Sequence, residues 1–151
     1  MIYLAADHRG FPLKEIVEVF LADEGYEYED VGADHLDPED DYVDFALDAA
    51  KKIAENPETH RGIFICGSGH GMDIVANRFH GIRAALCFNA DVARQSREHE
   101  DSNVLVLPAD WLTPDQEYEI FTTWLETKFS GEERHVRRMK KIKEIEERNF
   151  R

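Results

Sequence analysis

Cysteine, positive charge and long hydrophobic runs are all scarce in this chain of 151 residues. The two cysteines, Cys66 and Cys87, are too few for a disulfide framework and lack metal-ligand spacing. The net charge of −14 argues against a nucleic acid or an anionic membrane surface as partner. No signal peptide precedes the first apolar run, and no run is long enough to span a membrane. We therefore expect a cytoplasmic protein, with residues 1–151 forming one domain.

Short apolar runs alternate with stretches of helical periodicity along the whole chain. We expect strands at the apolar runs 2–6, 62–66, 83–88 and 103–108, and a further strand of alternating type at 26–31. Helical stretches separate them, one follows at about 115–129, and a charged final helix begins near residue 132. This alternation predicts an α/β fold: a three-layer sandwich with a five-stranded parallel sheet, Rossmann- or flavodoxin-like.

Ligands bind such sheets at the carboxyl ends of the strands. Asp7 and His8 follow the first expected strand, and Cys66 ends the third. These three side chains should therefore lie on the same edge of the sheet. Taken alone, each of the histidines near predicted strand ends, His8 and His99, fits a capping or surface residue better than a catalytic one.

The stretch "GIFICGSGHGMDIVANRF" (62–79) carries the strongest chemical signal. After Cys66, glycine stands at every second position (Gly67, Gly69 and Gly71), and a helix should begin at about Met72. The positive field of a helix N-terminus lowers a cysteine pKa from about 8.5 toward neutrality, which favours the reactive thiolate. The loop N–H groups could also bind an oxyanion or a phosphate. The alternative is that Cys66 is a small core residue, a description that fits Cys87 well.

Nucleotide-binding and phosphatase interpretations of this glycine-rich loop are weaker. A P-loop requires Gly-Lys-Ser/Thr, which is absent, and the dinucleotide fingerprint requires a different glycine spacing. A cysteine phosphatase would need an arginine at the far end of the loop, where Met72 stands.

A basic cluster interrupts the acidic composition near the C-terminus. The segment "RHVRRMKKIK" (134–143) holds six of the 18 lysines and arginines. Arg134 and Arg138 are four residues apart and therefore share one helical face, an arrangement that suits a phosphate. The alternative is a solvated helix end, where cations are favourable in any protein.

Taken together, these segments resemble the ribose-5-phosphate isomerase B family, which includes the galactose-6-phosphate isomerase subunits. The resemblance covers nearly the whole chain. It rests on "AADHRGF" (5–11), "DYVDFA" (41–46), "ICGSGHGM" (65–72), "IVANRFHGIRAALC" (74–87), "SREHEDSN" (96–103) and "EERHVRRMKKIKEIE" (132–146). It implies aldose–ketose isomerisation of a sugar phosphate through an enediolate, by default ribose 5-phosphate to ribulose 5-phosphate, without metal or cofactor.

The resemblance also implies a role for each site residue. Cys66 would be the base that moves the proton, His99 would open the sugar ring, and Asp41 would help to relay the proton. Ser68 and the N–H groups of the loop glycines would hold the enediolate oxygens. The residues implied to bind the remainder of the substrate are Asp7, His8, Glu100, Arg134 and Arg138. The family forms dimers or tetramers whose sites are shared between subunits, so we expect a homodimer or homotetramer, with the final helix at the interface.

Three residues depart from the family pattern. Glu100 stands in place of an asparagine, Asp110 in place of a phosphate-contacting arginine, and Val43 in place of the proline after the Asp-Tyr pair. At roughly 6 Å and an effective dielectric near 20, a charge pair is worth about 3 kcal/mol, so Asp110 should weaken phosphate binding. This predicts reduced use of ribose 5-phosphate and a preference for a different or uncharged sugar. Alternatively, Asp110 pairs with a C-terminal arginine (Arg134, Arg137 or Arg138), or the segment after Pro108 turns away from the pocket.

Three functions remain open at this point. The first is ribose 5-phosphate isomerisation, and the second is the same chemistry on another aldose, which need not be phosphorylated. The third is a non-catalytic sugar or nucleotide binder. Cys66, His99 and Asp41 together favour an enzyme, because binding alone requires neither a base nor a relay.

Overall fold

A parallel five-stranded sheet forms the centre of the computed structural model, which describes residues 1–150. The strands are β1 (Ile2–Ala6), β2 (Tyr28–Asp30), β3 (Arg61–Cys66), β4 (Ala84–Leu86) and β5 (Val104–Pro108), in the order β2-β1-β3-β5-β4. The helices are α1 (Phe11–Asp23), α2 (Tyr42–Ala54), α3 (His70–Ala76), α4 (Ala90–Glu100), α5 (Pro114–Glu126) and α6 (Glu133–Asn149). The predicted three-layer α/β sandwich is confirmed.

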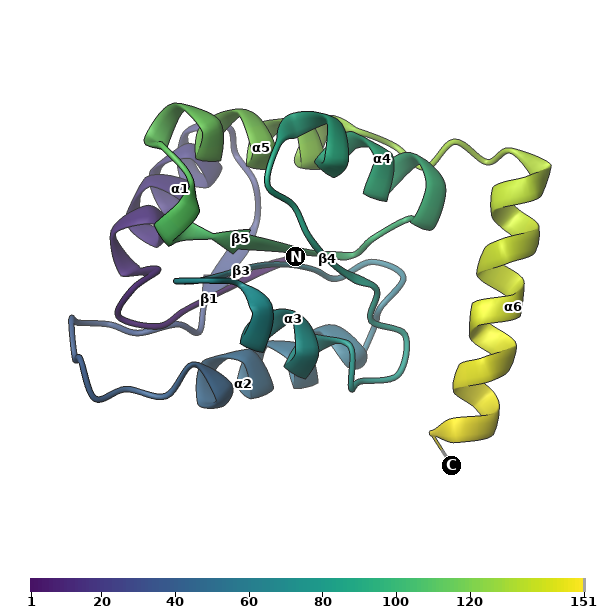
Figure 1. Cartoon of the computed structure of the whole chain (residues 1–151), viewed down its shortest axis with the longest axis horizontal. Helices are drawn as coiled ribbons and strands as arrows, with labels where there is room; N and C mark the ends of the chain where they lie inside the picture. Colours follow the sequence, from purple (N-terminus) through teal and green to yellow (C-terminus); the bar gives the residue numbers. More distant parts are fainter. Residues whose placement is uncertain (151) are drawn as a thin grey trace.

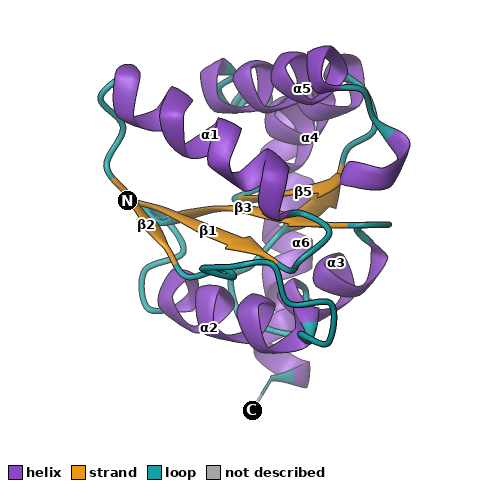
Figure 2. Ribbon diagram, turned by 90° about the vertical axis from the view of Figure 1, so that its left-hand side faces the viewer, coloured by secondary structure: helices purple, strands orange, loops and turns teal. Residues whose placement is uncertain are grey.

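Helices cover both faces of the sheet, α1, α4 and α5 on one side and α2 and α3 on the other (Figures 1 and 2). Strands β1, β3 and β5 are central and read as short, nearly continuous apolar runs, as expected for strands buried on both faces. Strands β2 and β4 lie at the edges and are only three residues long.

Local sequence signals explain where several helices begin. The side chains of Asp41 and Asn89 accept hydrogen bonds from the N–H groups of Val43 and Val92 and thereby cap α2 and α4. A capping box between Thr113 and Gln116 starts α5.

A buried lysine joins α1 to the segment that follows β2. Lys14 is 2% exposed; it pairs with Asp30 and donates to the carbonyl oxygen of Ala33 at 2.5 Å. A buried ammonium group is tolerated when it has such partners. The contact fixes the start of the loop that leads to Asp40 and Asp41.

Helix α6 stands beside the body of the molecule and belongs to neither helical layer (Figure 1). It carries apolar side chains that remain 40–50% exposed: Val136, Ile142 and Ile145. Such a face on an amphipathic helix is normally buried against another surface. Among the described residues, no helix combines the length and apolar character needed to cross a bilayer.

Candidate active site

The carboxyl edge of the sheet brings together the residues that follow β1 and β3. Strand pairing places Ala6 opposite Ile65, so Asp7 and Cys66 lie at the ends of neighbouring strands. The segment that carries Asp40 and Asp41 closes the same edge, because Asp40 reaches His8. The structure thus confirms that Asp7, His8 and Cys66 share one edge, and it adds Asp40 to them.

The loop after Cys66 leads directly into α3, which begins at His70, two residues earlier than expected. Gly69 precedes it with a φ of 77°, in the left-handed region that favours glycine. Ser68 Oγ accepts a weak hydrogen bond from the N–H of His70 at 3.4 Å. Cys66 itself is buried, with 4% of its surface exposed.

The prediction of a lowered Cys66 pKa is wrong for the unliganded chain. Burial raises the pKa of the Cys66 thiol, and the N–H groups of Gly69 and Met72 only partly counteract this effect. Asp7 also raises this pKa, whereas the Arg9 guanidinium lowers it. Desolvation was not foreseen because the depth of the sulfur cannot be read from the spacing of glycines.

Two of the loop glycines leave room for side chains from other segments. A Cβ added to Gly71 would lie 2.3 Å from ring atoms of Tyr42, and one added to Gly67 would lie 2.4 Å from the Arg9 Cζ atom. The loop is therefore covered by a phenol from the start of α2 and by a guanidinium from the turn before α1. The glycines permit this close cover as well as the approach of the backbone to a ligand.

Asp7, His8 and Asp40 form a hydrogen-bonded acidic group beside Cys66. Asp7 Oδ1 accepts from the N–H groups of Arg9 and Gly10, each at 3.0 Å, and burial raises the pKa of Asp7. The hydrogen bond between His8 Nδ1 and Asp40 Oδ1, at 2.5 Å, raises the pKa of His8 and favours its imidazolium form. Asp40 Oδ2 is buried and has no hydrogen-bond partner among residues 1–150.

These three side chains offer ligand atoms within 4.8 Å of one another, which a metal ion could use. Their unused acceptor atoms also suit the hydroxyl groups of a sugar. Asp7 retains acceptor capacity, and the buried Asp40 Oδ2 can accept from a hydroxyl group. The protonated His8 ring offers a donor to an anion.

Asp41 directly follows Asp40 and acts as the cap of α2. Its Oδ1 accepts from the N–H of Val43 at 3.1 Å, and the residue is exposed. The structure thus places Asp41 beside the Tyr42 that covers the loop. Its role in proton relay stays a prediction.

Asp110 lies at the same edge, in the 3₁₀ turn Ala109–Trp111 that follows β5. Its N–H donates to the carbonyl oxygen of Gly67 at 3.0 Å, and its carboxylate forms an ion pair with Arg9. The expectation that it pairs with a C-terminal arginine is wrong, and so is the alternative that this segment turns away. Arg9 supplies the cation because the β1–α1 turn and the turn after β5 both adjoin the Cys66 loop.

The remaining predicted site residues lie at the opposite edge of the sheet. His99 and Glu100 end α4, and three residues separate this helix from β5. Helix α6, which contacts α4, carries Arg134 and Arg138. The rings of His99 and His135 are 4.3 Å apart, and His135 is held by Ser130 at 2.6 Å.

The length of β5 separates this second group from Cys66. Val104 pairs with Gly62, and Pro108 pairs with Cys66, so the two edges are four residues apart. At about 3.3 Å per residue this separation is roughly 13 Å along the strand. A single chain therefore does not bring His99, Glu100, Arg134 or Arg138 to the thiol.

Sequence reasoning missed four residues of these two groups: Arg9, Asp40, Tyr42 and His135. Arg9, Tyr42 and His135 lie inside the quoted motifs, each next to a predicted site residue. Asp40 directly precedes the predicted residue Asp41. Their contacts join segments that are far apart in sequence, so no local pattern distinguishes them from solvated neighbours.

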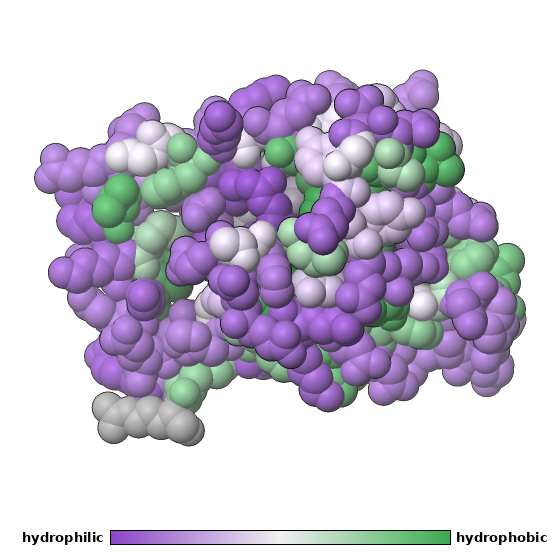
Figure 3. Space-filling view, turned by 180° about the vertical axis from the view of Figure 1, so that it is seen from behind, coloured by the Kyte–Doolittle hydropathy of each residue, from purple (hydrophilic) through white to green (hydrophobic). Residues whose placement is uncertain are grey.

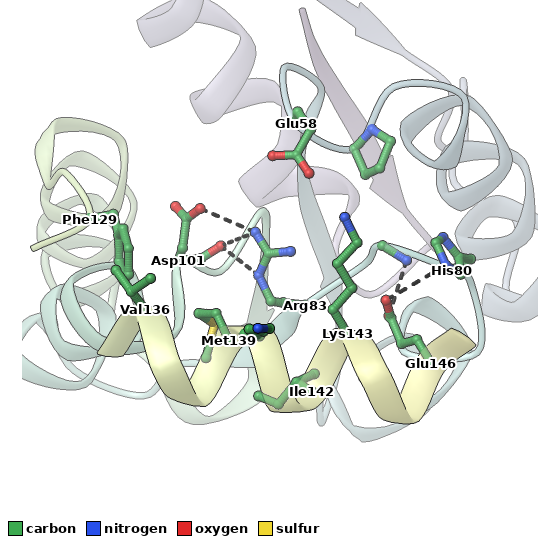
Figure 4. A pocket seen from close by; sticks show the side chains of 13 residues that line it. Glu58, His80, Arg83, Asp101, Phe129, Val136, Met139, Ile142, Lys143 and Glu146 are labelled. Atoms are coloured by element: carbon green, nitrogen blue, oxygen red, sulfur yellow. Dashed lines mark hydrogen bonds and ion pairs between the residues drawn. The ribbon is translucent and has the colours of Figure 1, made fainter. Parts of the chain in front are cut away.

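Two cavities lie under α6, well away from Cys66. One, of about 350 Å³, is lined by Val136, Met139 and Ile142 on the helix and by Arg83 and Asp101 on the body (Figure 4). The second, of about 360 Å³, lies next to Ile145. In the view from behind, hydrophobic atoms face the gap beside α6 (Figure 3).

A third cavity, of about 360 Å³, adjoins Asp40. The three cavities are of similar size, so cavity volume does not identify the site. The reactive side chains gather at the Cys66 loop, which is therefore the candidate active site.

Comparison with known proteins gives consistent matches along the chain. A family model described as Ribose/Galactose Isomerase matches residues 2–142. A probable ribose-5-phosphate isomerase B of Mycoplasma genitalium is 37% identical over 93% of this chain and 92% of its own length.

Solved structures agree with these sequence matches. Ribose-5-phosphate isomerase B from Mycoplasma genitalium with bound ribulose-5-phosphate superposes with a TM-score of 0.93 and 36% identity, covering 97% of this chain and 95% of the other. The Clostridium thermocellum ribose-5-phosphate isomerase B gives a TM-score of 0.90 and 43% identity, with 97% of both chains covered.

Proposed function

Because this chain belongs to the ribose/galactose isomerase family, we propose that it interconverts ribose 5-phosphate and ribulose 5-phosphate. The observation that carries the proposal is the arrangement of Cys66. A buried thiol lies at the end of β3, next to a loop of N–H donors and to the Asp7–His8–Asp40 group. The corresponding product, ribulose-5-phosphate, is bound in the similar Mycoplasma genitalium structure.

Cys66 is the proposed base for the proton on C2 of the open-chain aldose. A desolvated thiolate is a stronger base than a hydrated one, and the raised pKa of Cys66 reflects that strength. The thiol that forms can return the proton to C1 while the hydroxyl proton of O2 passes to O1, and these two transfers complete the change from aldose to ketose. Between these steps, the N–H groups of the 67–71 loop and the hydroxyl of Ser68 stabilise the enediolate oxygens.

The acidic group beside the loop orients the rest of the sugar. Asp7 and the free Asp40 Oδ2 accept from substrate hydroxyl groups, which supplies the partner that Asp40 lacks in the free chain. The His8 imidazolium, maintained by Asp40, donates to the phosphate.

A second copy of the chain would complete the site. Ring opening by His99 and phosphate binding by Arg134 and Arg138 require these groups near Cys66, and the length of β5 keeps them apart within one chain. The exposed apolar face of α6 and the cavities beneath it provide a surface for this copy. The proposal is therefore a homodimer, or a tetramer built from such dimers, with two shared sites.

The Arg9–Asp110 ion pair bears on the choice of substrate. A free Asp110 carboxylate would repel a phosphate, but Arg9 neutralises it. The main physical reason for expecting another or an uncharged sugar is thereby removed. Ribose 5-phosphate is the substrate that the site supports best.

The test is an isomerase assay on ribose 5-phosphate, ribose, allose and other aldoses, with the Cys66→Ala variant as control. We expect turnover of ribose 5-phosphate with a kcat/KM above that for every unphosphorylated aldose, and its loss in the variant. Preferred turnover of an unphosphorylated aldose would assign the same chemistry to another sugar. Absence of turnover on the whole panel, together with sugar binding, would show a non-catalytic binder and refute the proposal.

A further inference from the structure

Arg9 lies over the residue that directly follows Cys66, and neutralising Asp110 is the only role it has in the proposed function. Its side chain extends from the turn between β1 and α1 across Gly67. A Cβ on Gly67 would meet the Arg9 Cζ at 2.4 Å, Nε at 2.5 Å and Nη1 at 2.8 Å. The guanidinium therefore occupies the space that any side chain at position 67 would need.

Asp110 holds this guanidinium in place and is itself anchored to the Cys66 loop. Its carboxylate pairs with Arg9 Nη2, and its N–H donates to the Gly67 carbonyl oxygen at 3.0 Å. The Arg9 N–H is fixed as well, because it donates to Asp7 Oδ1 at 3.0 Å. Arg9 is thus restrained at its backbone and at the tip of its side chain.

Stability does not account for this arrangement. The Arg9 side chain is 54% exposed and that of Asp110 is 33% exposed, and ion pairs of this kind contribute little to folding. A guanidinium has five N–H donors, and the pair with Asp110 occupies only part of them. The remaining donors are available at the Cys66 loop, where the proposed reaction develops a negative charge on oxygen.

Building on the proposed isomerase function, we propose that Arg9 is a substrate-binding residue that donates to the enediolate oxygen beside the Cys66 loop, and that Asp110 is its positioning residue. The planar guanidinium suits this role because its charge is fixed and its donors diverge in a rigid fork. The ligand class is the enediolate of any aldose, with or without a phosphate, because the contact is made at the reacting carbons.

The first test measures the local charge without requiring turnover. Cys66 is alkylated with iodoacetate, an anion, and with iodoacetamide, which is neutral, and the two rates are compared by mass spectrometry at low salt. The variants are Arg9→Gln and Arg9→Lys. Arg94→Gln is the matched control, because Arg94 forms an exposed ion pair with Asp91 on α4 and its loss changes the net charge equally.

We expect Arg9→Gln to lower the iodoacetate-to-iodoacetamide rate ratio at Cys66 by about three- to tenfold, as loss of one charge at short range should. Arg9→Lys should retain most of the ratio, and Arg94→Gln should leave it unchanged. An unaltered ratio in Arg9→Gln, or an equal fall in Arg94→Gln, overturns the placement of Arg9 at the thiol.

The second test distinguishes a contact of Arg9 with the enediolate oxygen from a contact of Arg9 with the substrate phosphate. Arg9→Gln should lower kcat for ribose 5-phosphate by about 10- to 100-fold, somewhat less than a fully buried oxyanion donor, with little change in KM. A raised KM with an unchanged kcat would place Arg9 on the phosphate and overturn the assignment.

A double-mutant cycle with Asp110→Asn tests the positioning role. Asp110→Asn should change kcat when Arg9 is present and leave it unchanged in the Arg9→Gln background. Additive effects would refute the role of Asp110. If the parent protein isomerises no aldose, the proposed function fails, and the alkylation ratio still decides whether Arg9 places a positive charge at Cys66.

Discussion

Two inactive variants should restore each other's activity if the active site is divided between chains. Cys66→Ala removes the base at the carboxyl edge of the sheet, and His99→Asn removes the ring-opening group at the amino edge. In a mixed dimer, one site combines the intact Cys66 of one chain with the intact His99 of the other. The second site carries both defects and stays inactive.

The expected magnitude follows from this geometry. Both side chains must lie within about 3 Å of the atoms they act on, and the ring oxygen and C2 are both bonded to C1 of the sugar. The separation of roughly 13 Å along β5 is too large for one chain to meet this requirement. With random pairing, half of the dimers are mixed and one of their two sites is intact. Activity should therefore recover to about a quarter of the parent value.

The assay is coexpression of the two variants with different affinity tags, followed by isomerase measurements on the mixture. Heterodimers purified through both tags should reach about half of the parent activity per dimer. The matched control pairs Cys66→Ala with Asp7→Asn, whose defects lie on the same edge and should not complement. Activity in the mixture no higher than in the separate variants, or equal recovery in the control pair, would refute the divided site.

Four further outcomes are expected. Cys66→Ala should retain the fold and lose about 10²- to 10⁴-fold in kcat; near-normal activity would show that the base is misassigned. Iodoacetamide should alkylate Cys66 faster than Cys87, whose pKa burial raises to about 11; equal rates would contradict a reactive loop thiol. Asp40→Asn should lower the pKa of His8, so KM for ribose 5-phosphate should begin to rise at a lower pH; an unshifted profile would exclude this partnership. Burial raises the pKa of Glu117 to about 7, so its ionisation costs stability as the pH rises from about 4.5 through 7. Glu117→Gln should therefore stabilise the fold by about 1–3 kcal/mol at pH 8 and much less at pH 5, measured by denaturant unfolding; equal effects at both pH values would contradict the raised pKa.

The sheet was predictable because its central strands have a local signature. Strands β1, β3 and β5 are apolar runs bounded by polar residues, and the structure reproduces them within one residue. The edge strands were predicted too long, 26–31 against Tyr28–Asp30 and 83–88 against Ala84–Leu86. Each edge strand pairs with one neighbour only, β2 with β1 and β4 with β5, so the strand pattern in the sequence does not fix how far the pairing extends.

The site was only partly predictable from the sequence. Cys66 and Asp7 could be placed on one edge because parallel strands share their direction. By the same logic, His99 precedes β5 and so had to lie on the other edge. The Arg9–Asp110 pair joins residues about a hundred positions apart, and the burial that raises the Cys66 pKa depends on packing. Neither the ion pair nor the burial of the thiol has a local signal in the sequence.

The separation of His99 from Cys66 across the sheet also has a consequence for measurements at low enzyme concentration. If each site combines the Cys66 edge of one chain with the His99 edge of another, an isolated chain has no complete site and contributes no turnover. Specific activity should then fall on dilution, and below the dissociation constant of the dimer the observed rate should approach a second-order dependence on protein concentration. Substrate that bridges the two chains should oppose this loss by mass action, so progress curves begun without preincubation should show a lag.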